Sequence, residues 1–329
     1  MLYAVELERT AYDRNLAGLV LRCPRCGGTP EYRSAAQEPT FACGGCYFPI
    51  TLRDGIWAAL PPERAAYFSR FIADYEMIRA AEGRGSCEPQ YYLGLPYKDH
   101  SGNNQEQWKI RARTYTYLEK HILPKLQTNT GADARILDLG AGNGWMSYRL
   151  NRMGFRAVAV DLLVNDRDGL GAAKHYEYAL GALFPRFQAE NTRLPFASAQ
   201  FDAVIFNASF HYAESYWSCL AEALRCLKKN GLIVIADSPW YSEQASGERM
   251  LEERRAAFLQ RFGTSSNSIP SLEYLTDARL GELEKAFGIQ WERHSPFYGI
   301  RWALRPLSAR MQHRREPSRF GIYIAKKAI

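Results

Sequence analysis

From residue 131 onward, short apolar runs alternate with segments whose apolar residues recur at helical spacing. Residues 134–139 predict a buried strand, and residues 145–153 predict the helix after it. Further strands are predicted at residues 156–161, 201–207, 232–238, 289–294 and 320–325. Strands that alternate with helices are typical of an α/β fold, in which helices cover both faces of a largely parallel sheet.

The N-terminal part of the chain shows a different pattern. Residues 63–81 and 107–126 carry apolar residues at steps of three and four, which predicts two helices. A helix at residues 218–229 is expected to end at Asn230-Gly231 as a C-cap. We therefore divide the chain into residues 1–60, a helical linker or cap at 61–130, and an α/β domain at 131–329 with a helical cap inserted at about 239–271.

A glycine-rich turn joins the first predicted strand to its helix. Asp138 stands near the end of the strand, and Gly140, Gly142 and Gly144 follow at every second position. Glycine lets the backbone take positive φ and pass close to a ligand, and we expect free N–H groups at the helix start to face that ligand. A dinucleotide fingerprint needs its third glycine one residue later, where this chain has Trp145, so an NAD site is disfavoured.

The pattern Asp-x-Gly-x-Gly-x-Gly resembles the first motif of class I S-adenosylmethionine (SAM)-dependent methyltransferases. Three further stretches follow in the order of that family: a strand that ends in Asp161, a Leu-Pro-Phe stretch at residues 194–196, and a Phe-Asp pair that opens the strand at 201–207. The resemblance is to the small-molecule type of these enzymes. It implies a Rossmann-like seven-stranded sheet with helices on both faces, SAM as cofactor and S-adenosylhomocysteine as product.

The resemblance also implies a role for individual residues. The glycines would pass the methionine part of SAM with Asp138 near its ammonium group, and Asp161 would bind both ribose hydroxyls. Glu190 stands where the family usually has an Asp that contacts the adenine amino group, and Asn207 would lie beside the sulfonium. The cofactor residues implied in this way are Asp138, Gly140, Gly142, Gly144, Asp161, Glu190, Asn191 and Asn207.

The segment before the first strand often covers the cofactor in this fold class. Tyr97, Trp108 and Arg111 are candidates for that contact, with Arg111 at the carboxylate of SAM. The alternative is that the two aromatic residues belong to the core and the arginine is solvated.

Four cysteines form two C-x-x-C pairs, Cys23 with Cys26 and Cys43 with Cys46, separated by 16 residues. This spacing predicts a closed tetrahedral site for one structural zinc ion. The segment is too small for a large core of its own, so we expect metal to hold it together, with a core separate from that of the α/β domain. It resembles the zinc ribbons that accompany some RNA and protein methyltransferases. Cys87, Cys219 and Cys226 are interpreted as buried small residues.

Composition and charge narrow the remaining choices. The 329-residue chain is 47% hydrophobic, as soluble globular proteins are. No apolar run approaches the ~18 residues of a membrane span, and the N-terminus does not have the pattern of a signal peptide, so a cytoplasmic protein without a membrane partner is expected. Eight Lys and Arg residues against Glu316 follow position 300, a balance of +7 that equals the net charge of the whole chain. Phosphate binding and a solvated loop both explain this segment.

Three functions fit these patterns. The first is methyl transfer to O, N or C of a small molecule, the second is methylation of an rRNA or tRNA base with the ribbon and the basic segment on the RNA, and the third is SAM binding without catalysis. His211, just past the fourth strand, is the candidate general base, with Tyr241 and His294 as substitutes. The sequence indicates no oligomeric state.

Overall fold

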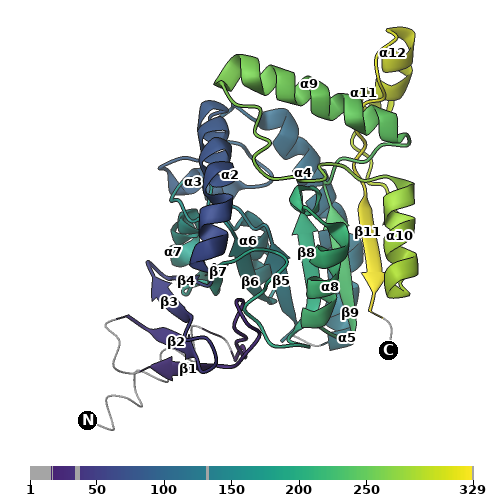
Figure 1. The fold of residues 1–329 in the computed structure, drawn as a ribbon. Helices are drawn as coiled ribbons and strands as arrows, with labels where there is room; N and C mark the ends of the chain where they lie inside the picture. The colour runs from purple at the N-terminus through teal and green to yellow at the C-terminus, as the bar shows by residue number, and fades with distance from the viewer. Residues whose placement is uncertain (1–15, 17, 34–37, 131–132, 328–329) are drawn as a thin grey trace.

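A computed structural model describes residues 16, 18–33, 38–130 and 133–327 (Figure 1). Its central feature in this part of the chain is a seven-stranded sheet with the order β7-β6-β5-β8-β9-β11-β10. The strands are β5 (Arg135–Leu139), β6 (Arg156–Asp161), β7 (Arg186–Gln188), β8 (Phe201–Asn207), β9 (Leu227–Ala236), β10 (Glu292–His294) and β11 (Ile322–Lys326). Strands β5 to β9 pair in parallel, and β11 runs antiparallel between β9 and β10. The predicted Rossmann-like sheet is confirmed.

Helices cover both faces of this sheet, and the alternation of side chains along its strands explains why. Ile136 and Ile205 point into a core formed with the helices α4 to α6, whereas Leu137 and Phe206 belong to a second core with α8 and α10. The bounds are α4 (Gln105–Tyr117), α5 (Leu123–Thr130), α6 (Trp145–Arg152), α8 (Tyr216–Cys226) and α10 (Asp277–Phe287), with a π-helical turn at Leu118–Ile122 between α4 and α5.

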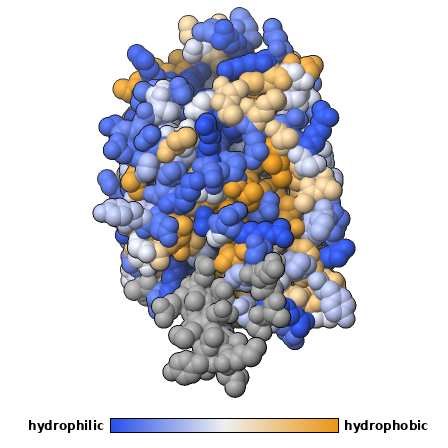
Figure 2. All heavy atoms as spheres, turned by 90° about the vertical axis from the view of Figure 1, so that its left-hand side faces the viewer, coloured by the Kyte–Doolittle hydropathy of each residue, from blue (hydrophilic) through white to orange (hydrophobic). Residues whose placement is uncertain are grey.

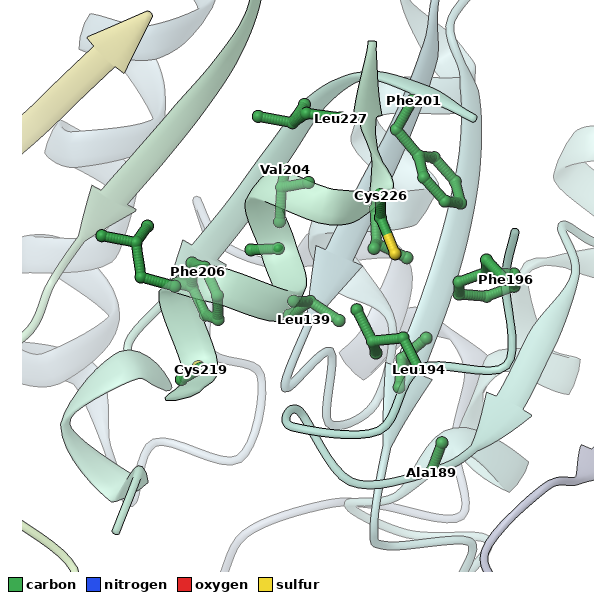
Figure 3. Packing of buried hydrophobic residues seen from close by; sticks show 14 of the residues in the cluster. Leu139, Ala189, Leu194, Phe196, Phe201, Val204, Phe206, Cys219, Cys226 and Leu227 are labelled. Carbon is green, nitrogen blue, oxygen red and sulfur yellow. The ribbon is translucent and has the colours of Figure 1, made fainter. Parts of the chain in front are cut away.

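The second core accounts for two of the three cysteines outside the ribbon. Cys219 and Cys226 of α8 are fully buried beside Val204 and Phe206 of β8 (Figure 3). The interpretation of both as buried small residues is confirmed. Cys87 is exposed, so for this residue the interpretation was wrong.

The helical elements outside these two layers lie mainly at the carboxyl ends of the parallel strands (Figure 1). They include α2 (Pro62–Ala81), α3 (Pro89–Gly94), α7 (Glu177–Leu180), α9 (Gln244–Phe262), α11 (Ile300–Ala303) and α12 (Arg305–Met311), and two 3-10 turns, Leu170–Tyr176 and Phe210–Tyr212. α9 lies in the segment predicted as an inserted cap and crosses above the strand ends (Figure 1).

The helix at residues 218–229 differs from its prediction. α8 ends at Cys226, and β9 begins at the next residue. Asn230 does take a positive φ of 64°, but it does so inside β9, where the pairing with β8 shifts register between Phe201 and Ala203. The Asn-Gly pair therefore marks a bulge in a strand rather than the end of a helix.

The cysteine-rich segment is continuous with the large sheet. Its strands are β1 (Pro30–Arg33), β2 (Thr40–Cys43), β3 (Pro49–Arg53) and β4 (Ile56–Ala58), and β4 pairs in parallel with β7. Trp57 of β4 stacks on Phe187 of β7, and Ile50 belongs to the same buried cluster as Leu137. The expectation of two separate cores was wrong, because apolar residues of the ribbon complete the core of the α/β domain.

The surface is mainly hydrophilic on the side of α2 and α3, and hydrophobic residues gather near the middle of this face (Figure 2). In the part of the chain that the structure describes, no helix has both the length and the hydropathy needed to cross a bilayer.

Candidate active site

The glycine turn after β5 has the backbone that the sequence predicts. Gly140, Gly142 and Gly144 have φ values of 73°, 54° and 76°, in the left-handed region that favours glycine. A Cβ on Gly140 would lie 2.3 Å from the Cβ of Ser209, so the turn also passes too close to the end of β8 for any side chain.

The N–H groups of this turn bond inside the protein. Those of Gly140 and Ala141 donate to the carbonyl of Val160, and that of Gly142 donates to Asp161. At the start of α6, the N–H of Trp145 donates to Asn143, and that of Ser147 donates to Asp138. For these amides the expectation of free donors that face a ligand was wrong. They fix the turn against β6, and the cradle is a matter of backbone shape.

Two carboxylates stand at the ends of β5 and β6. Oδ2 of Asp138 accepts hydrogen bonds from the backbone N–H and the hydroxyl of Ser147, and burial raises the pKa of Asp138 to about 7. Asp161 accepts from the N–H of Leu163 at 2.8 Å and of Gly142 at 2.7 Å, and burial raises the pKa of Asp161. Each carboxylate is therefore held in one orientation by its neighbours.

These residues line a cavity of about 1240 Å³, the first cavity, at the carboxyl ends of the parallel strands. This is where ligands bind in open α/β sheets. The structure brings together there most of the residues that the resemblance implies: Asp138, Gly140, Gly142, Asp161, Glu190, Asn191, Asn207 and Arg111. Gly144 does not line the cavity but lies between two residues that do, Asn143 and Trp145. Oδ1 of Asn207 is buried and has no partner among the described residues.

Glu190 has a partner that the sequence did not indicate. The guanidinium of Arg64, from α2, donates to both of its carboxylate oxygens at 2.7 to 3.1 Å, and Thr192 donates a further hydrogen bond. Phe68 and Phe71 of the same helix also line the first cavity. α2 is therefore a wall of the site, fixed to the strand ends by a charge-assisted fork.

A second cavity of about 1020 Å³ adjoins the first. Six residues line both cavities: Phe71, Tyr75, Arg79, Arg111, Ala208 and Tyr212. Three arginines of the second cavity form ion pairs, Arg79 with Asp168, Arg84 with Glu82 and Arg254 with Glu273. Arg111 differs from them, because none of the acids in the described residues forms a salt bridge with it. Its guanidinium lies 4.9 Å from the ring centre of Trp108.

The acid that stands out in the second cavity is Asp237, which the sequence analysis did not consider. It follows directly on β9, with a φ of 52°, and its Oδ1 accepts a hydrogen bond from Thr114. Oδ2 is buried without a partner in the described residues, and burial raises the pKa of Asp237 to about 6. Its position at a strand end, like those of Asp138 and Asp161, is the signal by which it could have been found.

The three histidine and tyrosine candidates lie in different places. His211 lines the second cavity, with Nδ1 3.3 Å from the hydroxyl of Ser238, and burial lowers the pKa of His211 to about 4. Tyr241 is buried against Tyr274, and His294 contacts Tyr117 on the far edge of the sheet. Neither Tyr241 nor His294 lines either cavity, so the structure does not support them as substitutes for His211.

Two of the aromatic candidates also lie outside both cavities. Tyr97 is exposed, and its hydroxyl donates to Glu119. Trp108 is buried edge-on against Trp145 at 5.9 Å between ring centres. Its contribution to the site is indirect, because Trp145 lines the first cavity and Arg111 lies over the Trp108 ring.

The four predicted cysteine ligands come together. All their Sγ atoms lie within 4.8 Å of one another, at 3.5 Å for Cys23 and Cys46 and 3.4 Å for Cys26 and Cys43. Four thiolates about 2.3 Å from one ion is the arrangement of a structural zinc site, and this cluster has the size to hold it.

The backbone of the two knuckles differs in one detail from the expected glycine turns. In the first knuckle, Gly27 takes a positive φ and its N–H donates to the carbonyl of Cys23. In the second, Tyr47 does both with Cys43, whereas Gly44 and Gly45 have ordinary backbone angles.

Comparison with known proteins agrees with this geometry. Residues 137–235 match the model of a family described as a methyltransferase domain. A demethylmenaquinone methyltransferase of Mycolicibacterium paratuberculosis is 30% identical over 107 residues, which are 32% of this chain and 43% of the relative. This chain thus matches less than half the length of that relative.

Two solved structures show the distance of the structural likenesses. One is a 1,6-didemethyltoxoflavin-N1-methyltransferase of Burkholderia thailandensis with 1,6-didemethyltoxoflavin and S-adenosylhomocysteine bound (18% identity, TM-score 0.45, 91% of this chain and 99% of the other). The other is a SAM-dependent methyltransferase of Thermotoga maritima (15% identity, TM-score 0.42, 80% and 99%). Likenesses this distant say nothing of the acceptor. The family match and the cavity-lining motifs coincide in sequence, so residues 137–235 belong to the SAM-dependent methyltransferase domain family.

Proposed function

We propose that the protein transfers the methyl group of SAM to a small-molecule acceptor. The observation that carries this proposal is the pair of adjoining cavities. The first is lined by the motif residues of the methyltransferase domain, and the second opens beside it with six lining residues in common. A cofactor and an acceptor in these two spaces would meet at Ala208, at the end of β8.

The residues of the first cavity fit SAM in chemical type. Asp161 keeps acceptor capacity on both oxygens for a ribose diol, since each accepts one backbone hydrogen bond. Asn207 presents a buried oxygen without a partner at the strand end where the sulfonium is expected. The carboxylate of the methionine part is assigned to Arg111, whose charge has no salt-bridge partner in the described residues. When bound, SAM supplies an electrophilic methyl group.

Glu190 is the least certain match in chemistry, because Arg64 already neutralises it. Its carboxylate still has lone pairs for the adenine amino group. We propose that the ion pair sets the orientation of Glu190 and closes the adenine end of the cavity with α2.

Proton transfer is assigned to Asp237 rather than His211. A general base works best when its pKa lies near the working pH. The pKa of Asp237 is raised to about 6, so near pH 7 most of it is carboxylate while it remains a useful base. His211, with a pKa lowered to about 4, is neutral but weakly basic, and it is assigned to the wall of the acceptor cavity. The remaining effect is proximity, because the two cavities hold acceptor and methyl donor side by side.

The size and lining of the second cavity favour a small acceptor over an RNA base. Beyond residue 300 only Phe320 lines it, so the basic C-terminal segment does not surround its walls. The curated relative is named as a demethylmenaquinone methyltransferase, which supports an acceptor of the small-molecule class.

The four-cysteine cluster is assigned a structural role. It would hold one zinc ion through Cys23, Cys26, Cys43 and Cys46, and the chemistry of four thiolates leaves no open position for a substrate.

The proposal is tested by incubating the protein with SAM labelled in its methyl group, together with separate pools of metabolites and of structured RNA. We expect label in the metabolite fraction, with an Asp161→Ala protein as the control that should transfer little. Label in RNA alone would support the RNA function instead. Catalytically silent protein that still binds SAM would favour a SAM-binding role.

Replacing Asp161 by alanine is expected to weaken SAM binding by at least ~1.5 kcal/mol, the scale of hydrogen bonds to a charged group. Isothermal titration calorimetry measures this directly. Asp166→Ala is the matched control, because Asp166 is an exposed acid in the next loop. Unchanged affinity in Asp161→Ala would remove Asp161 from the cofactor site.

Replacing Arg111 by methionine keeps much of the side-chain volume and removes the charge. We expect the dissociation constant of SAM to rise roughly 10- to 100-fold, because a hydrogen bond to a charged group is lost. The KM of the acceptor should change little. Lys109→Met, an exposed change on the same helix, is the control. A raised acceptor KM with normal SAM binding would place Arg111 at the acceptor.

A further inference from the structure

The segment that contains α11 and α12 projects at one end of the molecule (Figure 1). Helical hydrogen bonds continue between the two short helices, since the N–H of Leu304 donates to Ile300 and that of Ser308 donates to Leu304. The two elements therefore act as one helical segment of residues 300–311.

One face of this segment is apolar and exposed. Ile300, Leu304, Leu307 and Met311 follow one another at steps of four, three and four, which places them on the same side of a helix with ~3.6 residues per turn. Their exposed fractions are 72%, 52%, 58% and 74%, and Phe297, just before the segment, is 71% exposed. We call these five residues the apolar stripe.

The opposite side of the segment holds it to the protein. Trp302 stacks on Phe320 at 5.4 Å between ring centres, and the guanidinium of Arg305 lies 3.3 Å from the ring centre of Trp302. The apolar stripe is therefore not the side by which the segment packs on its own chain. Nothing in the described residues covers it.

Cations border the apolar stripe. Arg301 and Arg310 lie on the helical segment about 80° to 100° to either side of the stripe, at ~100° per residue, and Arg314 follows it. All three are exposed, and none forms an ion pair in the described part of the chain. Beside them runs a groove between α9 and α12 that is lined by five arginines, Arg249, Arg301, Arg305, Arg314 and Arg315, and by one acid, Glu253.

We propose that the apolar stripe and its arginines dock on an anionic lipid surface. A helix that lies in the plane of a bilayer needs an exposed apolar face with cations along its edges, which is the arrangement here. Phosphates of a nucleic acid would satisfy the arginines but would leave five large apolar side chains in water. The expectation of no membrane partner considered only spanning segments, and this surface lies on a membrane without crossing it.

The location gives the surface a relation to the acceptor cavity. α9 contributes Arg249 and Glu253 to the basic groove and Arg254 and Phe258 to the second cavity. One helix thus separates the two, so a membrane under the groove would lie beside the place where an acceptor enters. The docking itself does not depend on the proposed methyl transfer.

The test is co-sedimentation of the full chain with phosphatidylcholine vesicles, with and without phosphatidylserine. We expect binding that needs phosphatidylserine and weakens with added salt. Leu304→Ser with Leu307→Ser, and separately Arg301→Gln with Arg310→Gln, should each reduce the bound fraction at least ~10-fold in affinity. Val20→Ser and Lys120→Gln with Lys125→Gln are matched exposed changes elsewhere and should bind as the parent does.

Circular dichroism and SAM calorimetry on the same variants check that folding and the cofactor site are intact. Three results would overturn the proposal: no vesicle binding by the parent protein, equal binding by the Leu304→Ser Leu307→Ser protein, or a dimer in light scattering that only this double variant abolishes. Binding to an RNA oligonucleotide that needs the arginines but not the stripe would assign the surface to RNA.

Discussion

Replacing Asp237 by asparagine is expected to lower the turnover number about 10²- to 10⁴-fold, the usual contribution of a general base. Asparagine has the same shape and can still accept the hydrogen bond of Thr114, so the cavity should keep its form. SAM affinity should stay within about twofold, because Asp237 lines only the second cavity. Steady-state kinetics with the acceptor found by labelled SAM, and calorimetry with SAM, measure the two quantities.

The pH profile separates a base from a binding residue. The carboxylate is the active form of Asp237, so the parent turnover number should rise as pH increases through about 6 and then level off. In Asp237→Asn this limb should disappear. His211→Ala is the matched change in the same cavity, and we expect it to lower turnover less than tenfold and to raise the acceptor KM. If His211→Ala instead lost 10²-fold or more and Asp237→Asn lost little, the two roles would be reversed.

Removal of zinc is expected to destabilise the whole chain and not the ribbon alone. An ion present at about 1,000 times its dissociation constant stabilises a fold by about 4 kcal/mol. For a protein of this size that corresponds to a fall of roughly 10 °C in the thermal midpoint. Chelation and Cys23→Ser should both produce it, and metal analysis should find one zinc ion in each parent chain.

The reason for this extended effect is that Trp57 stacks on Phe187 and that α2 follows four residues after β4. Loss of the ribbon should therefore loosen Arg64 from Glu190 and weaken SAM binding as well. Cys87→Ser is the control, since Cys87 is exposed and outside the cluster. Protein that loses zinc yet keeps its thermal midpoint and its SAM affinity would restore the view of two independent domains.

The periodic part of the sequence predicts the α/β fold well, because each strand from β5 to β9 is a short apolar run buried on both faces. The cofactor residues Asp138, Asp161 and Asn207 also follow from the sequence. They stand at or near the ends of parallel strands, and strand ends of one sheet meet at one edge. Local pattern and global position agree at these sites.

The features that the sequence did not reveal depend on contacts between distant segments. Arg64 reaches Glu190 over 126 positions, and Thr114 reaches Asp237 over 123, and no local pattern encodes such pairs. Tyr97 and His294 were placed by their position near predicted elements, and the packing directs them elsewhere. Similarly, spacing identifies the four cysteines but does not indicate which sheet the ribbon joins.

The pairing of β4 with β7 also protects the protein from its own edge. Without the ribbon, β7 would end the sheet with a row of unpaired N–H and C=O groups beside Phe187, and such an edge can recruit strands of other molecules. With the ribbon attached, the outermost strand on this side is β1, a four-residue strand with Glu31 and Arg33. Short charged strands are poor templates for association. The cysteine-rich segment is thus the solubilising border of the methyltransferase sheet.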